Sequence, residues 1–298
     1  MKNKASQTAL MSAFCRAFHA EHEKQPVFTD FMVKKLLTDE EFEQIKHYIL
    51  QGAAFFEPDR IFSSETECLR YLINTHLAPT PLCRAAYCET ALAAAVFTGT
   101  VQYVILGAGL DTFILRHPEF CEKHKIFEAD HPLTQKDKQM RIARAGLTVP
   151  KNACFVPVDF SKDNLEEFPL KSGFDPRKKS FFSLLGVSYY LTRPEIENLL
   201  SSLSRLMAEG STLLFDVPDK NLFLSKERRV QNMLAMAKAS GEEMKSCFDY
   251  FTLEKMLSDC GFLIYEYLTP KDIQSQIIKG ADMKAFEHIC CVQAVFKP

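Results

Sequence analysis

The stretch Val101–Asp130 constrains the fold of this chain more than any other. It opens with an apolar run of strand length, Val101–Leu106, which breaks into a Gly-Ala-Gly turn at 107–109. A helical segment then leads to a second apolar run that ends in the acid Asp130. Strand, glycine turn, helix, strand and terminal acid together predict a βαβ unit of the kind that binds nucleotides.

Each part of this unit suits a nucleotide for a physical reason. Glycines at 107 and 109 let the backbone turn sharply and let a ligand approach where a Cβ atom would collide. The N-terminus of the following helix offers unpaired N–H groups. Asp130 follows Gly109 by 21 residues, close to the spacing of about 20 residues expected between a phosphate-binding turn and an acid that accepts ribose hydroxyls.

The third position of the glycine pattern decides between two kinds of nucleotide. A dinucleotide site favours Gly or Ala three residues after the second glycine, and this chain has Thr112 there. That favours an adenosine without a pyrophosphate, for which S-adenosylmethionine is the commonest candidate. An NAD site and a purely structural turn remain as alternatives.

Composition limits the partners of the chain. Its 298 residues carry a formal net charge of −2, which gives no electrostatic footprint for nucleic acid or an anionic membrane. No apolar run is long enough to span a bilayer. The ten cysteines form no CxxC pair, which favours buried thiols in a reducing cytoplasm over disulfides or metal ligands. We therefore expect a small-molecule partner and no metal; the oligomeric state stays open.

Helical patterns fill the first hundred residues. Residues 6–22 carry apolar side chains at helical spacing, and Arg16 lies off that stripe. Thr38–Glu41 and Ser64–Glu67 are capping-box patterns, each followed by apolar residues at helical period. These helices come before the glycine turn in the chain.

After Asp130 the chain alternates between strand and helix. A polar helix rich in Lys and Arg is expected over 131–145 with its side chains in solvent. Residues 222–248 have a helical pattern interrupted near Gly241. Further strands are expected at 153–157, 179–185, 211–217, 262–268 and 289–296. The connection rules for α/β domains then predict one sheet of about seven strands.

Ligands of an open parallel sheet bind beyond the carboxyl ends of its strands. The predicted ends carry the glycine turn, Asp130, Asp159–Phe160 and Leu185–Gly186. Asp159 could accept a hydrogen bond from an adenine amino group while the ring of Phe160 packs on the base. The alternative is that Asp159 caps a helix after Ser161.

The succession of these motifs resembles the leucine carboxyl methyltransferase-like family of S-adenosylmethionine-dependent O-methyltransferases. The resemblance covers roughly residues 5–220, and its most specific part is Gly-Ala-Gly-Leu-Asp-Thr at 107–112. The family includes protein C-terminal carboxyl methyltransferases and bacterial enzymes described as acting on polyketides or other secondary metabolites. The strings that carry it are Ile105–Thr112, Phe127–Pro132, Val158–Asp159, Gly173–Pro176 and Gly186–Leu191.

The resemblance implies a fold and an activity. The expected fold is the class I methyltransferase Rossmann-like sheet of about seven strands with the last strand antiparallel. Residues 1–80 would form a helical lid or substrate cap, and residues 81–298 the domain that binds S-adenosylmethionine. The expected activity is methyl transfer to a carboxylate or hydroxyl of a small molecule.

The resemblance also assigns residues. Arg84 would grip the methionyl carboxylate of the cofactor, since a guanidinium fork suits a carboxylate. Arg16 loosely matches a basic residue near that carboxylate, but its spacing differs, and a solvated arginine is the favoured interpretation. The remaining cofactor contacts are Gly107, Ala108, Gly109, Asp130, Asp159, Phe160 and Leu185, and the candidate acceptor contacts are Tyr189, Tyr190 and Arg16.

Two positions depart from the family pattern. Many relatives have Arg where this chain has Phe113, and Glu where it has Leu185. Without that carboxylate, the contact that relatives make with the amino group of the cofactor is in question. A non-catalytic protein that binds the cofactor is therefore an alternative function. Tyr189, Tyr190 and His131 are candidates for a general base, and none is assigned.

Overall fold

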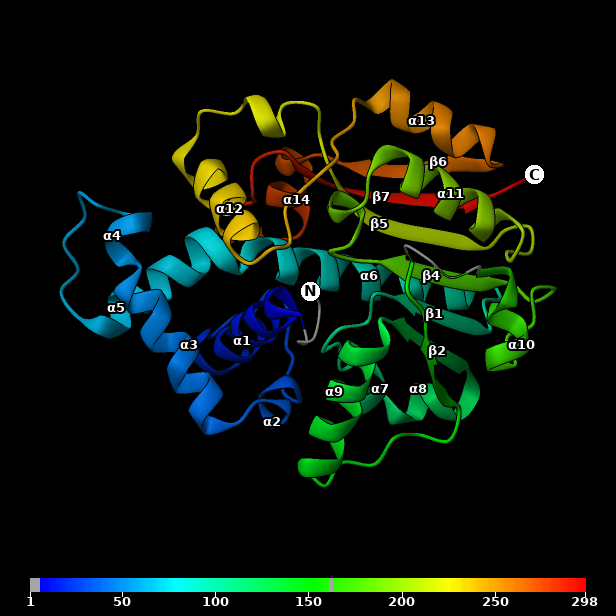
Figure 1. Cartoon of the computed structure of the whole chain (residues 1–298), viewed down its shortest axis with the longest axis horizontal. Helices are drawn as coiled ribbons and strands as arrows, with labels where there is room; N and C mark the ends of the chain where they lie inside the picture. Colours follow the sequence, from blue (N-terminus) through cyan, green and yellow to red (C-terminus); the bar gives the residue numbers. More distant parts are fainter. Residues whose placement is uncertain (1–5, 161–162, 164) are drawn as a thin grey trace.

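The fold is built on a seven-stranded sheet in the order β3-β2-β1-β4-β5-β7-β6 (Figure 1). It comes from a computed structural model that describes residues 6–160, 163 and 165–298. Only β7 runs antiparallel to its neighbours, β5 and β6. This confirms the predicted sheet. The strands are β1 Gln102–Leu106, β2 Lys125–Asp130, β3 Ala153–Pro157, β4 Ser180–Leu184, β5 Thr212–Pro218, β6 Phe262–Leu268 and β7 Ile289–Phe296.

Helices precede the sheet and cover both of its faces. The N-terminal ones are α1 Gln7–His22, α2 Val33–Leu36, α3 Asp39–Gln51, α4 Ala53–Phe56, α5 Glu65–Leu72 and the π-helix η1 Ile73–Leu77. The others are α6 Pro79–Phe97, α7 Phe113–Arg116, α8 Pro118–Lys123, α9 Pro132–Arg144, α10 Phe168–Ser172, α11 Arg193–Ser204, α12 Arg228–Ala239, α13 Tyr250–Asp259 and α14 Pro270–Gln276. The 3-10 turns are η2 Leu165–Glu167, η3 Ser188–Tyr190 and η4 Leu222–Leu224.

The central strands are buried on both faces, as expected for parallel strands between helix layers. Every residue of β1, β4 and β5 is buried. Successive side chains of a strand point to opposite faces, so Tyr103 and Ile105 join one apolar cluster while Val104 and Leu106 join another. The first cluster includes residues of α6, α7, α8 and α14, and the second includes residues of α10, α11 and α13.

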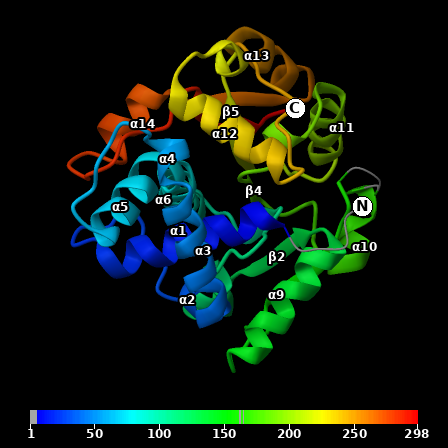
Figure 2. The same cartoon turned by 60° about the vertical axis from the view of Figure 1, so that its left-hand side comes forward.

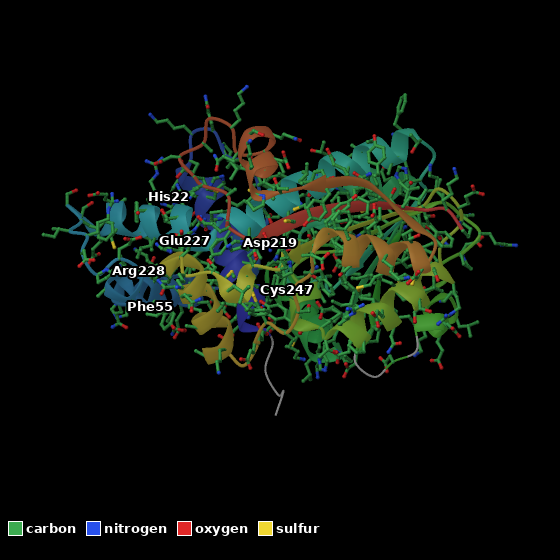
Figure 3. The ribbon with its side chains drawn as sticks, turned by 90° about the horizontal axis from the view of Figure 1, so that it is seen from above. His22, Phe55, Asp219, Glu227, Arg228 and Cys247 are labelled. Carbon is green, nitrogen blue, oxygen red and sulfur yellow. The ribbon has the colours of Figure 1, made fainter. Side chains whose placement is uncertain are left out.

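The N-terminal helices α1 to α5 lie beside one end of the sheet (Figures 1 and 2). The buried stripe of α1, including Phe14 and Phe18, belongs to the same cluster as α6 and one face of the sheet. α4 meets α12 where the Asn232 side chain donates to the carbonyl of Phe55, 3.2 Å away; Figure 3 labels Phe55 and the nearby Arg228. The start of α1 lies at the edge where the parallel strands end, with Ala9 beside Gly109.

Helix α9 is not the solvent-facing helix that its Lys and Arg content predicts. Lys138 is 1% exposed and pairs with the buried Glu128 of β2. Burial raises the pKa of Glu128 to about 7, against the lowering effect of Lys138. Arg141 is also buried and pairs with Glu41 of α3 at 2.7 Å. Lys138 therefore attaches this helix to the sheet, and Arg141 attaches it to the N-terminal helices.

The region 222–248 is less helical than predicted. After η4, α12 ends at Ala239, and the next helix begins at Tyr250. Gly241 has φ +77°, a left-handed conformation that commonly follows a helix end. The segment 240–249 is therefore a loop. Among the described residues, no helix combines the length and apolar character that crossing a membrane requires.

Candidate functional site

A cavity of about 1210 Å³ lies at the carboxyl ends of β1 to β4. This is the edge where the order of the sheet changes direction, between β1 and β4. The structure brings every site residue predicted from the sequence to its wall: Arg16, Arg84, Gly107, Ala108, Gly109, Asp130, Asp159, Phe160, Leu185, Tyr189 and Tyr190.

Both glycines of the turn have left-handed backbone, and Gly107 leaves no room for a side chain. Gly107 has φ +74°, and a Cβ atom there would collide with Cγ2 of Val187. Gly109 has φ +50°, and its Cβ would lie 3.4 Å from the Cβ of Ala9 in α1. Left-handed backbone favours glycine at both positions, and at Gly107 the contact with Val187 excludes a side chain as well. The N-terminal turn of α1 thus lies directly against the turn.

Asp130 is tied to the glycine turn. The amide of Gly109 donates to Oδ2 of Asp130, and the amide of His131 donates to Oδ1 at 2.6 Å. Burial raises the pKa of Asp130, and these two amide bonds oppose that rise. Each carboxylate oxygen keeps further acceptor capacity, which suits the two hydroxyls of a ribose.

Asp159 and Phe160 stand on the same wall, one strand further along the sheet. The Asp159 side chain is 18% exposed, and its Oδ2 lies 3.9 Å from Nε2 of His131. The amide of Asp159 donates to Asp163 at 2.8 Å. The alternative role of Asp159, capping a helix after Ser161, falls on residues 161, 162 and 164, outside the described residues.

Arg84 belongs to a hydrogen-bonded network beneath the cavity. Its Nη1 donates to the hydroxyl of Tyr189 at 2.6 Å and to Oδ2 of Asp216 at 3.1 Å. The Tyr189 hydroxyl donates in turn to Oδ2 of Asp216 at 2.9 Å, and the amide of Gly186 donates to Oδ1 at 2.7 Å. Asp216 is 0% exposed. Burial acts to lower the pKa of Arg84, but Tyr189 and Asp216 together outweigh it, and the pKa rises.

Asp216 was not identified from the sequence. The sequence does contain one indication of its role. Asp216 is an acid inside the apolar run of the fifth strand, and a carboxylate in that position needs a buried partner. Arg84 supplies that partner from a helix that lies 132 positions earlier in the chain. The separation explains why the pair is not visible in either segment alone.

The sequence favours a solvated side chain for Arg16, and the structure contradicts this interpretation. It is 6% exposed, pairs with Asp30, and donates through Nη2 to the carbonyl of Leu110 at 2.8 Å. Asp30 is 0% exposed and also accepts from the hydroxyl of Thr112 at 2.6 Å. Arg16 lies off the apolar stripe, but α1 is enclosed on that side as well. It therefore ties α1 to the segment after the glycine turn.

The two departures from the family pattern have different surroundings. Phe113 is 4% exposed, and its ring packs edge-on against Tyr103 with 5.1 Å between centroids. Leu185 is half-buried on the cavity wall. Tyr190 is also half-buried, and burial, followed by the charge of Glu242, raises its pKa to about 12. Across the described residues, His, Cys, Asp and Glu form no group of three suited to hold a metal ion.

Comparisons with known proteins add the family context. Residues 9–204 match the family model described as leucine carboxyl methyltransferase. The chain is 43% identical over 303 residues to the Bacillus subtilis protein named "Putative S-adenosyl-L-methionine-dependent methyltransferase YktD", covering 99% of each chain. A similarly named Parafrankia protein is 31% identical over 150 residues, covering 50% of this chain and 46% of its own.

Solved structures share the fold. A DUF574 family protein from Streptomyces avermitilis superposes with a TM-score of 0.60 at 9% identity, over 99% of this chain and 98% of its own. A Thermobifida fusca protein described as a "putative methyltransferase" gives a TM-score of 0.58 at 11% identity, over 100% and 97%. At such low identity these likenesses show the architecture alone.

Proposed function

This chain belongs to the leucine carboxyl methyltransferase family, and we propose that it transfers a methyl group to a carboxylate or hydroxyl oxygen of a small acceptor molecule. It is an S-adenosylmethionine-dependent methyltransferase. A polyketide-type metabolite is one acceptor class that the family resemblance suggests.

One observation carries the assignment of the cofactor to this cavity. Arg84, the glycine turn and Asp130 line a single cavity at the switch point between β1 and β4. The donor set fits the cofactor chemically: a guanidinium suits the methionyl carboxylate, and a carboxylate suits the ribose diol. We propose that Arg84 binds the amino-acid tail of the cofactor and that Asp130 binds its ribose. The turn at 107–109 lets the cofactor approach the backbone closely. Asp159 and Phe160 contact the adenine.

When bound, the cofactor supplies an electrophilic methyl group on a sulfonium. The chain's own task is to orient the acceptor oxygen and to exclude water. A carboxylate acceptor needs no base because it is ionised at neutral pH, whereas a hydroxyl acceptor benefits from one. The Tyr189 hydroxyl is already committed to Arg84 and Asp216. We therefore give it a positioning role and no role as a base.

We assign residues 1–80 the role of a cap over the acceptor. Ala9 lies against the glycine turn, and Ser6, Thr8 and Ser12 line the cavity. Arg16 fastens this helix to Leu110. These contacts put the first turns of α1 on the same cavity as the predicted cofactor residues.

Calorimetry with two ligands tests the assignment. Both ligands contain adenosine, but S-adenosylhomocysteine carries the amino-acid tail and 5′-methylthioadenosine lacks it. Arg84→Ala is expected to weaken S-adenosylhomocysteine by about 1.5–3 kcal/mol, the value of one charged hydrogen bond, and to leave 5′-methylthioadenosine unchanged. Asp130→Ala is expected to weaken both.

Arg177→Ala is the control, because the Arg177 side chain is 87% exposed and pairs only with Asp175 among the described residues. The proposal fails if the unaltered protein binds neither ligand. It also fails if Arg84→Ala weakens the two ligands equally.

A cofactor-binding protein without catalysis is the second candidate. The observation that favours it is Leu185, an apolar side chain on the cavity wall at the position where many relatives carry an acid. Tight binding of S-adenosylhomocysteine without methyl transfer to any member of a broad acceptor panel would support this candidate.

A further inference from the structure

The cavity has more room than the cofactor alone requires. Its volume of about 1210 Å³ exceeds the range of about 300–1000 Å³ that is usual for one ligand. The part not claimed by predicted cofactor residues lies between the start of α1, η3 and the loop 240–245. We call it the acceptor lobe and define it by Ser6, Thr8, Tyr190, Glu242 and Lys245.

Glu242 is the acid of this lobe with an unsatisfied oxygen. Its Oε1 accepts from the hydroxyl of Ser6 at 2.9 Å. Its Oε2 is buried and has no hydrogen-bond partner among the described residues. A buried acceptor without a donor costs about 1–3 kcal/mol, and more if it is charged. A donor group on a bound molecule would recover that cost.

The side chains around Glu242 do not supply a hydrogen-bond donor to Oε2. The Ser6 hydroxyl is used on Oε1. The Tyr190 hydroxyl keeps its proton near neutral pH, because burial, followed by the charge of Glu242, raises its pKa to about 12. It nevertheless makes no hydrogen bond to Oε2. Lys245 is exposed, and the acid whose pKa its charge lowers is Glu195, at the start of α11. No described residue donates to Oε2, which leaves this atom available to a donor on an occupant of the lobe.

The position of Glu242 allows it to turn toward an occupant. It lies in the loop between α12 and α13, and its neighbours Gly241 and Glu243 are both exposed. Glu242 therefore belongs to neither helix.

We propose that Glu242 recognises the acceptor through a hydroxyl or amino group, and that an anionic group is rejected at this position. The proposal rests on the methyl transfer proposed above and concerns the end of the acceptor that meets Glu242, whichever oxygen takes the methyl group. A neutral donor completes the hydrogen bonding of Oε2, and an ammonium group adds charge attraction. A carboxylate there would face a like charge.

Three ligands that share a phenyl ring and differ in their terminal group test this proposal. Phenethylamine ends in an amine, 2-phenylethanol in an alcohol, and phenylacetate in a carboxylate. Each is titrated into the full-length protein saturated with S-adenosylhomocysteine. Phenethylamine and 2-phenylethanol are expected to bind at least about tenfold more tightly than phenylacetate, a difference of about 1.4 kcal/mol.

Glu242→Gln is expected to remove most of the preference for phenethylamine over phenylacetate and to leave the affinity for S-adenosylhomocysteine unchanged. Glu227→Gln is the matched control, since Glu227 is exposed, directly precedes the first residue of α12 and does not line the cavity. Figure 3 labels its position. Equal binding of the three ligands, tightest binding of the acid, or binding of none would overturn the proposal. So would equal effects of the two substitutions. Failure of S-adenosylhomocysteine to bind the unaltered protein would instead overturn the proposed function.

Discussion

The guanidinium group of Arg84 occupies the space that a side chain at Gly186 would need. A Cβ atom on Gly186 would lie 2.5 Å from Nη2, 2.6 Å from Nη1 and 2.7 Å from Cζ of Arg84. Gly186 also has φ +73°, a conformation that other residues adopt at a cost. The glycine after β4 therefore serves Arg84 as well as the turn.

Gly186→Ala is expected to displace Arg84 and to weaken S-adenosylhomocysteine at least about tenfold, or about 1.4 kcal/mol. Calorimetry measures the affinity, and thermal unfolding shows how much fold is retained. Gly173→Ala is a matched control, because Gly173 has the same φ of +73° and a Cβ atom there would meet nothing within 4 Å. If both variants lose the same affinity, backbone strain explains the effect and Arg84 does not.

Asp216→Asn is expected to lower the free energy of unfolding by about 3 kcal/mol, the lower end of the range for breaking a buried ion pair. The substitution leaves the Arg84 cation without its buried partner. Urea denaturation followed by circular dichroism measures the loss. In a double-mutant cycle, Arg84→Met with Asp216→Asn is expected to cost less than the sum of the single changes. Additive losses would show that the two residues are not coupled.

Arg16→Ala is expected to destabilise the protein by about 3 kcal/mol, because Asp30 would remain buried with fewer donors. Thr112 and Arg116 still face Asp30, at 2.6 Å and 3.6 Å, which keeps the expected loss near the lower end of the range. Urea denaturation gives the value. Arg70→Ala is the comparison: the Arg70 side chain is 47% exposed, and such pairs contribute about 0–1 kcal/mol. Equal losses for both arginines would contradict the buried role of Arg16.

The pairing of Glu41 with Arg141 is expected to make stability depend on acid pH. Hydrogen bonds from Arg141 outweigh burial and lower the pKa of Glu41 from 4.5 to about 2. A carboxyl group with a lowered pKa adds stability above its unfolded value, and this contribution is lost as the pH falls through its folded value. The melting temperature of the unaltered protein should therefore approach that of Glu41→Gln as the pH drops from 4.5 toward about 2.

The neighbouring Glu40→Gln provides the control for this pH series. Glu40 is exposed, and its side chain accepts only from Gln44 among the described residues. The melting temperature of Glu40→Gln should differ from that of the unaltered protein by the same amount at every pH. A constant gap between Glu41→Gln and the unaltered protein across the acid range would contradict the assignment.

Removal of residues 1–12 is expected to speed the release of S-adenosylhomocysteine at least about tenfold. The deletion removes Ser6, Ala9 and Ser12 from the cavity wall, and it keeps the buried stripe that starts at Ala13. Stopped-flow displacement measures the dissociation rate without any acceptor. An unchanged rate would contradict the cap role of this segment.

Local patterns were enough to predict much of the fold. The glycine turn, the acid at the end of β2 and the apolar strand runs predicted the sheet, and the structure has a seven-stranded sheet with β7 antiparallel. The Thr38 capping box also forms as predicted, with both of its hydrogen bonds. These features depend on residues close together in the chain or on the period of a strand.

Other features depended on contacts between distant segments. Asp216 meets Arg84 only because β5 passes beside α6, and Lys138 is buried only because Glu128 lies beneath α9. A charged residue in a polar pattern reads as solvated unless its partner is known. The loop at Glu242 reaches the cavity because α12 ends at Ala239, before the end of the helical pattern predicted over 222–248.

Helix α9 connects the end of β2 to the N-terminal helices. It begins directly beyond Asp130 and, through Arg141 and Arg144, holds Glu41 and the carbonyl of Leu36. Its 13 residues span about 20 Å. Chimeras that exchange the first eighty residues between relatives should therefore exchange residues 132–144 as well. An α9 from another protein would lack the contacts that hold the transplanted helices in place.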